Sequence, residues 1–500
     1  TMAPTTEKPE AMVTESPVGA DEGKENAPQV AAKKAKAKGA TGKKKESDVD
    51  YPALEKQIAQ LKAGAAGNTD EAKLAQTLEK LLALEKTYRL QADLKATSMC
   101  CVAVVQTCFE AKQWKLLNEN VILISKRRAQ LKQAVGTTVK ESIGYIEATP
   151  DEETKVELIK TLTSVTEGKI YLELERARLT RKLAAIFEAR GKIEEAAEVL
   201  QEVAVETFGA MAKTEKIAFI LEQVRLCLKK KDFIRAFILV KKVTPRAFSE
   251  SRLVADSKTG EKKEMAMDGT AAAPPDKGIP SLEELKLTYY EHLIAYYDYT
   301  GDALEICRSY QNIYDTPSIK SNEDRWTAVL KKVCWYVVLA PSGPMQNSIL
   351  HTVYKDENLS KLPLYETLLK IFVKSDIEQW TDVLERFGGE MMAFKEEIIS
   401  QEGKDKFQET FKLRVIEHNI QVISQYYNKI TIKRLADISS ISADEAEKYL
   451  SDLVVKKIVK AKINRPLGIV SFGAPSKPDE ILTKWADEIG KLLVLLETTN

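Results

Sequence analysis

The sequence ITIKRLADISSISADEAEKYLSDLVVKKIVKAKINRPLGIVSF, residues 430–472, contains the signals that decide the fold. It opens on the β-branched run Ile430-Thr431-Ile432, which predicts a short strand, and the stretch Lys433–Ile438 predicts a short helix after it. Ser442, with Glu445 three residues later, has the pattern of a capping box, in which each side chain satisfies a backbone N–H of the other residue. A second helix is therefore expected to begin directly after Ser442.

Two β-type runs close this stretch. Ile458–Ile463 and Leu467–Phe472 are joined by three residues that include a proline, a combination typical of a hairpin. A short strand, two helices and a hairpin in this order predict a winged-helix module over residues 411–474. A further helix is expected from about Asp479 to Glu497, within a C-terminal segment that comprises residues 475–500.

Residues 51–410, on the N-terminal side of the module, show helical spacing nearly throughout. Candidate turns follow one another at 38, 41, 40, 70 and 40 residues, and they fall at Lys112, Pro150, Gly191, Lys231, Gly301 and Pro341. The interval of 70 is one period plus the 30 polar, Gly- and Pro-containing residues 249–278, which predict an inserted surface loop. A period near 40 with a helix on each side of the turn predicts an all-α solenoid of helical hairpins, similar to TPR or HEAT repeats.

Packing positions recur at fixed offsets from these turns. Trp114, Ile193 and Phe233 each follow a turn by two residues, and Ala196 and Ala236 each follow one by five. Small side chains at the later position would let one helix approach the next. Any all-helical protein has turns at similar intervals, but the common offsets favour a repeat.

The N-terminal segment, residues 1–50, contains no Leu, no Ile and no aromatic residue. Such a composition buries too little apolar surface to offset the entropy of ordering the chain, so a disordered tail is expected. Its basic cluster predicts either a nuclear-import or polyanion-binding segment or simply a solvated tail, and it consists of Lys33, Lys34, Lys36, Lys38, Lys43, Lys44 and Lys45.

Composition and motifs argue against an enzyme. The 500 residues have a formal net charge of +1, which gives no global electrostatic case for nucleic-acid binding. The longest apolar run, Val333–Ala340, is far shorter than the roughly 20 residues of a membrane span, and no signal-peptide core is found. The nucleophile-elbow, dinucleotide-binding and P-loop motifs are missing from the sequence. We therefore expect no catalytic residues and no cofactor. A hydrolase ranks third, after an assembly scaffold and a nucleic-acid-binding protein.

Metal ligands are not expected either. The three histidines lie about 60 residues apart, and no C-x-x-C pair occurs among the six cysteines. Cys101 and Cys108, seven residues apart, could share a helix face, but a zinc site would need closer spacing and a further ligand. Buried thiols and structural histidines at His292 and His418 are the more usual outcome for such isolated residues.

A winged helix can place its second helix in the DNA major groove. Here that helix begins with Asp444, Glu445 and Glu447, which phosphates would repel, whereas the rest of the module is basic at Lys433, Arg434, Lys460, Lys462 and Arg465. We therefore expect a protein-binding or simply solvated face here, with nucleic-acid binding as the alternative.

Three segments carry a resemblance to a known family. The sequence YYEHLIAYY at 289–297, the sequence ICRSYQ at 306–311 and residues 430–472 resemble PCI-domain subunits of the proteasome regulatory-particle lid. The resemblance extends from about Tyr51 to the C-terminus. It implies a non-catalytic scaffold that supports ubiquitin-dependent degradation, with winged helices joined side by side and C-terminal helices gathered in one bundle. A subunit of a sister PCI complex, the signalosome or a translation initiation factor, stays open as an alternative.

The same resemblance implies the partners. They would be other PCI-domain lid subunits, the lid deubiquitinase, and the base and core particle of the proteasome, in a hetero-oligomer without a membrane. It also implies a cytoplasmic and nuclear location. This chain lacks the closely spaced histidines that the zinc-dependent deubiquitinase needs, so it is not that subunit.

Two candidate partner-binding surfaces follow from the pattern of apolar residues. The first is the strand containing Leu467, Ile469 and Phe472, which we expect to lie at an open sheet edge where another chain could pair. The second is one face of the C-terminal helix, an arc of about 120° at 100° per residue that contains Ile481, Leu482, Trp485, Ile489, Leu492, Leu493 and Leu496.

Overall fold

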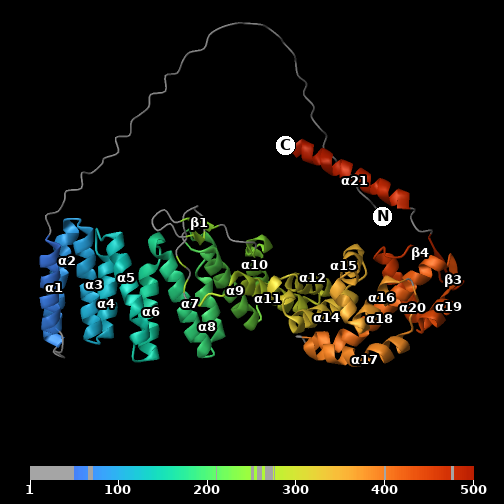
Figure 1. The fold of residues 1–500 in the computed structure, drawn as a ribbon, viewed down its shortest axis with the longest axis horizontal. Coiled ribbons are helices and arrows are strands. Elements are labelled where there is room, and N and C mark those ends of the chain that lie inside the picture. The colour runs from blue at the N-terminus through green and yellow to red at the C-terminus, as the bar shows by residue number, and fades with distance from the viewer. Residues whose placement is uncertain are drawn as a thin grey trace, which may run out of the picture. The chain divides into compact units, whose positions relative to one another are not determined.

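A computed structural model gives the fold of the chain (Figure 1). The residues that it describes are 50–65, 71–209, 211–248, 253–255, 262–264, 274, 276, 278–374, 376–398, 401–473 and 478–499. Residues 1–49, for which the sequence predicts a disordered tail, lie outside them. The chain divides into Thr1–Asp50 and Tyr51–Asn500, and the architecture below is that of the second unit.

The first part of this unit consists of helices packed in chain order. They are α1 (Tyr51–Ala65), α2 (Glu71–Leu90), α3 (Leu94–Glu110), α4 (Trp114–Lys126), α5 (Lys132–Gly144), α6 (Glu152–Thr166), α7 (Glu173–Ala189), α8 (Ile193–Gln201), α9 (Lys213–Lys229) and α10 (Phe233–Lys242). Each helix contacts its neighbour in sequence or the one after it, as in α3 with α5 and α9 with α11. This pattern confirms the predicted solenoid of helical hairpins.

The helical arrangement continues beyond the inserted loop. Its helices are α11 (Leu282–Thr300), α12 (Ala303–Tyr314), α13 (Pro317–Lys320), α14 (Glu323–Leu339), α15 (Pro344–Tyr354), α16 (Pro363–Val373), α17 (Trp380–Glu397) and α18 (Gln401–Tyr426). Of the loop itself, the structure describes chiefly a short antiparallel pair, β1 (Leu253–Ala255) with β2 (Lys262–Glu264). The Arg178 guanidinium on α7 donates to the Pro274 carbonyl at 2.8 Å, which ties the end of the loop to an earlier repeat.

Four of the predicted turns share one backbone conformation. Lys112, Gly191, Lys231 and Gly301 all have left-handed φ angles, between 54° and 75°. In each turn the next residue donates its N–H to the carbonyl five residues earlier, for example Asp232 to Cys227 at 2.9 Å. This is the Schellman motif, in which a left-handed residue ends one helix and satisfies its last carbonyls.

The residue offsets predicted from the sequence correspond to real packing positions. Trp114, Ile193 and Phe233 are the first residues of α4, α8 and α10. Ala196 and Ala236, three positions further on, are fully buried. The small side chains therefore lie in the interior of the helical packing.

The C-terminal module has the predicted winged-helix order. It consists of β3 (Lys429–Thr431), α19 (Ile432–Ser439), α20 (Ala443–Val455), β4 (Ala461–Asn464) and β5 (Ile469–Phe472). The capping box at the start of α20 is formed, because Ser442 and Glu445 bond each other's backbone N–H. The first hairpin strand begins at Ala461 and not at Ile458, since the Ile458 N–H donates to the Leu453 carbonyl and closes α20.

The solenoid and the winged helix share one long helix. α18 continues through residues 410 and 411, so the structure has no break at the boundary expected there. Its second half contributes Ile416, Ile420 and Ile423 to the core of the winged helix. Its first half packs Phe407 and Phe411 against the fully buried Trp335 of α14.

Candidate partner-binding surfaces

The winged-helix sheet has the strand order β3-β5-β4, and all of its pairings are antiparallel. The strand that contains Ile469 and Phe472 is therefore the central one, and the prediction that it forms an open edge is wrong. The error arises because β3, about 40 residues earlier in the chain, pairs with the side of the hairpin that the sequence leaves open. The open edges of this sheet are β3 and β4.

The three residues predicted on that strand do not form one surface. Leu467 lies in the turn before β5 and is 67% exposed. Ile469 is half-buried on the outer face of the sheet. Phe472 is buried in the core of the module, where it packs with Val470 and residues of the two helices. Only Leu467 and Ile469 are accessible to a partner.

Strand β4 presents unpaired backbone groups along its outer side. The Gly473 N–H donates to the Lys460 carbonyl at 2.7 Å, and the register continues with Lys462 opposite Ser471. Alternate residues of an antiparallel pair bond the neighbouring strand. The N–H and C=O groups of Ala461 and Ile463 therefore point away from β5, toward the open side.

The edge at β3 is less suited to pairing. This strand has three residues, and the side chain of its last residue, Thr431, accepts a hydrogen bond from the Arg434 N–H as the N-cap of α19. The helix begins at once and turns the backbone out of the sheet. The candidate strand-pairing site is therefore the edge of β4.

The predicted C-terminal helix is α21 (Pro478–Thr499). The large apolar side chains of this helix are exposed, from 40% at Ile489 to 66% at Leu495. Six of them belong to the predicted face, and these are Leu482, Trp485, Ile489, Leu492, Leu493 and Leu496. The seventh predicted residue, Ile481, belongs to the helix, but its side chain lies outside the described residues. This apolar face is therefore not covered by the described part of the chain.

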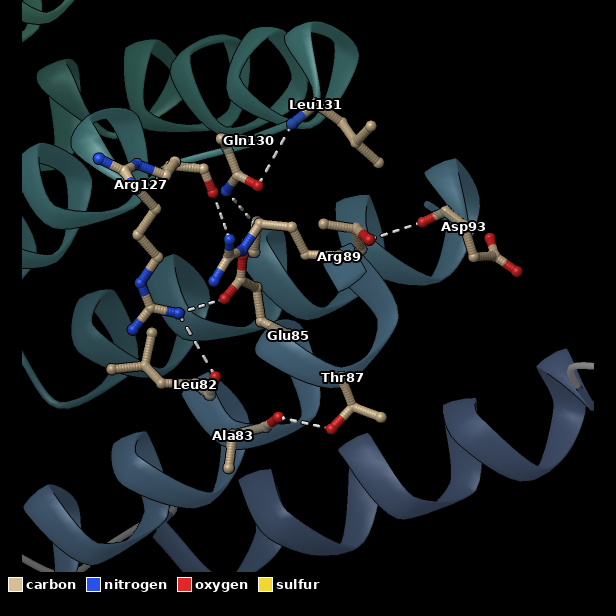
Figure 2. A network of polar contacts seen from close by, with 12 residues as sticks. Leu82, Ala83, Glu85, Thr87, Arg89, Asp93, Arg127, Gln130 and Leu131 are labelled. Atoms are coloured by element: carbon tan, nitrogen blue, oxygen red, sulfur yellow. Dashed lines mark hydrogen bonds and ion pairs between the residues drawn. The ribbon is translucent and has the colours of Figure 1, made fainter. Parts of the chain in front are cut away.

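A buried ion network is a feature that the sequence analysis missed (Figure 2). The Glu85 carboxylate on α2 is fully buried and accepts a hydrogen bond from Arg89 Nε at 3.0 Å and another from Arg127. Arg127 also donates to the Leu82 carbonyl, and Arg89 donates to the Arg128 carbonyl. Both guanidinium groups are thus occupied within the protein, and the network fixes the end of α4 to α2.

The six cysteines and the Nε2 atom of His292 are buried. All six cysteines are free thiols without solvent access, and burial raises the pKa of Cys101 and of Cys108 to about 12. His292 on α11 has a buried Nε2, and desolvation lowers its pKa to about 4. Within the described part of the chain, His, Cys, Asp and Glu side chains do not gather in groups of three or more suited to a metal ion.

None of the described helices is both long enough and apolar enough to cross a membrane. Among the described residues, the edge of β4 and the apolar face of α21 are both accessible. Both are protein-binding features. Together with the helical repeat and the winged helix, they define the class of PCI-domain scaffold proteins.

Comparison with known proteins gives the family. The model of the N-terminal region of PSMD12 and CSN4 matches residues 76–259 and 278–322, and the PCI-domain model matches residues 391–474. The 26S proteasome non-ATPase regulatory subunit 12 homologs A and B of Arabidopsis thaliana are 51% and 49% identical, over 86% and 85% of this chain and 95% and 94% of their own lengths. The regulatory subunit RPN5 of Saccharomyces cerevisiae is 34% identical over 84% of this chain and 88% of its own length.

The chain belongs to the family of 26S proteasome non-ATPase regulatory subunit 12. It is a non-catalytic, structural subunit of the regulatory-particle lid that assembles with other lid subunits and supports ubiquitin-dependent degradation. As a proteasome subunit it works inside the cell. The signalosome and translation-initiation alternatives are less supported.

Proposed function

We propose that this subunit assembles through two separate surfaces, the open edge of β4 and the apolar face of α21. The edge would join the winged helix of a neighbouring PCI-domain subunit, and α21 would enter a bundle with helices of other subunits. The observation that carries the proposal is the exposure of six large side chains along one face of α21. Burial at roughly 1.5 to 3 kcal/mol each amounts to about 9 to 18 kcal/mol before the cost of ordering is subtracted.

Removal of α21 tests the bundle. We expect a chain without residues 479–500, or one with Trp485→Asp and Leu492→Asp, to be folded with an unchanged melting temperature, because this face is exposed in the described part of the chain. The same variants should fail to enter the lid when co-expressed with the other subunits, as measured by native gel. The matched control is Asp487→Ala with Glu488→Ala, which alters the opposite, polar face of the helix. A clear fall in the melting temperature of the isolated truncated chain would show that α21 belongs to its own fold.

A proline in β4 tests the edge. In Ala461→Pro the lost N–H is one that points away from β5, so the internal sheet keeps its hydrogen bonds. We expect weaker association with the neighbouring subunit in a pull-down, and a folded module by circular dichroism. Ala461→Val is the control, because it adds bulk and keeps the N–H. Normal association of the proline variant would exclude pairing at this edge.

The particular partners are part of the proposal. The resemblance to lid subunits supports contact with the lid deubiquitinase and with the base and core particle, and cross-linking of the assembled proteasome followed by mass spectrometry would identify them.

We also propose a cytoplasmic and nuclear location, with the lysine cluster of residues 33–45 as the import signal. Replacement of those lysines by glutamine should reduce the nuclear fraction of a fluorescent fusion.

A further inference from the structure

The outer face of the winged-helix sheet is basic next to the β4 edge. Side chains alternate between the two faces of a strand. Val470 and Phe472 point into the core, so Ser471 and Gly473 lie on the outer face. The register places Lys460 beside Gly473, and Lys462 beside Ser471. Lys460 and Lys462, both exposed, therefore stand on the outer face of the edge strand.

Gly473 makes room for this arrangement. A Cβ atom at that position would lie 3.2 Å from the Lys460 Cβ, closer than side chains normally pack. On the far side of β5, Lys429 of β3 occupies the same row as Ser471 and Lys462. In the part of the module that the structure describes, neither Lys429 nor Lys462 forms an ion pair, whereas Arg465 is paired with Glu447 at 2.6 Å.

The opposite face of the same strand is apolar. Ala461 and Ile463 are half-buried, and both pack against the edge of the winged-helix core. A strand that paired with β4 would extend this core on one face and lie beside the two lysines on the other. The alternation is the same for a parallel and an antiparallel partner, since successive side chains point to opposite faces in both.

We propose that the segment that binds β4 is a strand of alternating character, with acidic side chains beside Lys460 and Lys462 and apolar side chains beside Ala461 and Ile463. This inference rests on the edge pairing proposed above and adds the chemistry of the partner. Cross-strand pairs of opposite charge stabilise a sheet, and like charges directly opposite destabilise it. Any strand could form hydrogen bonds with the backbone of β4. The two lysines would favour a strand with acidic side chains over the others.

A protein strand fits this site better than a nucleic acid. The N–H and C=O groups of Ala461 and Ile463 alternate along the edge, which matches another backbone. An apolar side chain shares this face with the lysines, because half-buried Ile469 lies two residues from Ser471, the residue opposite Lys462. Phosphates gain nothing from such neighbours, whereas an amphipathic strand does.

Charge reversal tests the inference in the full chain. We expect Lys460→Glu with Lys462→Glu to weaken incorporation into the co-expressed lid by about tenfold, since two attractive pairs become repulsive. The matched control is Lys433→Glu with Lys448→Glu, which makes the same change in charge at two exposed positions on α19 and α20, outside the sheet, and should leave incorporation unchanged. A p-benzoylphenylalanine residue at position 464, on the same face of β4 as the two lysines, should cross-link to a segment with acidic residues at alternate positions, as identified by mass spectrometry.

Three outcomes would overturn the inference. If Ala461→Pro blocks incorporation but the charge reversal does not, edge pairing stands and the acidic partner strand is excluded. If neither variant has an effect, the proposed edge pairing itself fails. If the reversal abolishes binding of a fluorescein-labelled 20-nucleotide RNA or a 20-base-pair DNA by the full chain and leaves incorporation normal, the lysines serve a nucleic acid.

Discussion

At the scale of single residues, burial determines what the titratable groups of this chain do. His292 lies within α11, with its ring near Arg225 and Glu222 of α9. The sequence predicted a structural role for this histidine from its distance to the other two histidines. The buried Nε2 has no hydrogen-bond partner among the described residues, and this detail could not be read from the sequence. The residue therefore stabilises the fold only in its neutral form.

The stability of the protein should fall in mild acid because of His292. Its pKa in the folded chain is about 4, below the ordinary value of 6.5, so the unfolded chain binds the proton first. The contribution of the neutral ring is complete above pH 6.5 and is lost as the pH falls toward 4, by about 3 kcal/mol. In His292→Leu, urea denaturation should show a shallower loss of stability between pH 6.5 and 4 than in the unsubstituted chain. Equal slopes in the two proteins would contradict this assignment.

The buried ion network also shows where sequence reasoning ends at this scale. Glu85 and Arg89 are four residues apart on α2, a spacing that predicts a helix pair. Arg127 is 42 residues away from Glu85, and only the stacking of the first hairpins brings it to the same carboxylate. The complete burial of that carboxylate likewise depends on the packing of helices that no local pattern specifies.

At the scale of elements, turns were predictable and strand neighbours were not. The candidate turns at Lys112, Gly191, Lys231 and Gly301 coincide with the left-handed residues. They could be predicted because the residues that end a helix lie close together in the sequence. The capping box at Ser442 is local in the same way. The sheet order depends on β3, a strand of three residues that pairs across two helices, and such a short run carries too little pattern to reveal its partner.

The left-handed turns should respond to substitution in opposite directions. At Lys231, with φ of 63°, glycine removes the steric cost of the conformation, and Lys231→Gly should stabilise the α9–α10 hairpin by up to about 1 kcal/mol. At Gly191, with φ of 75°, Gly191→Ala should destabilise the α7–α8 hairpin by about 1 kcal/mol. Native-state hydrogen exchange of each hairpin measures the change, and the unsubstituted hairpin in each variant is the control. A loss of protection in Lys231→Gly would mean that the lysine side chain contributes more than the strain costs.

At the scale of the whole molecule, most contacts between the described helices are between neighbours, and the junction around Trp335 is where several helices meet. The aromatic cluster around Trp335 unites α14, α16, α17 and α18 through Tyr365, Phe394, Phe407 and Phe411. A solenoid whose repeats touch only their neighbours opens from an end, whereas a junction of several helices opens with the whole unit. The sequence predicted the repeat and the module after it, but not the helix that they share.

The rate of amide hydrogen exchange should be lowest where the most helices meet. Among the helices of the solenoid, we expect the slowest exchange in α14 and α18, where several elements converge, and the fastest in α1, the first helix of the repeat. The exposed helix α21 should exchange faster than all of them. Hydrogen exchange with mass spectrometry of the full chain measures both regions. Uniform protection along the chain would contradict the nearest-neighbour description. Trp335→Ala should raise the exchange of α18 and leave that of α3 unchanged.

The neighbour-to-neighbour packing has a mechanical consequence. A small rotation at one junction between hairpins disturbs only the contacts of that junction, and rotations at successive junctions add up along the chain. We therefore expect the repeat to bend by small amounts at many junctions. The helices that meet at Trp335 should bend less, because several of them pack on one side chain. A force applied to the N-terminal hairpins would bend the repeat and would displace the winged helix only a little. Strain in the surrounding assembly could thus vary while the β4 edge kept its alignment.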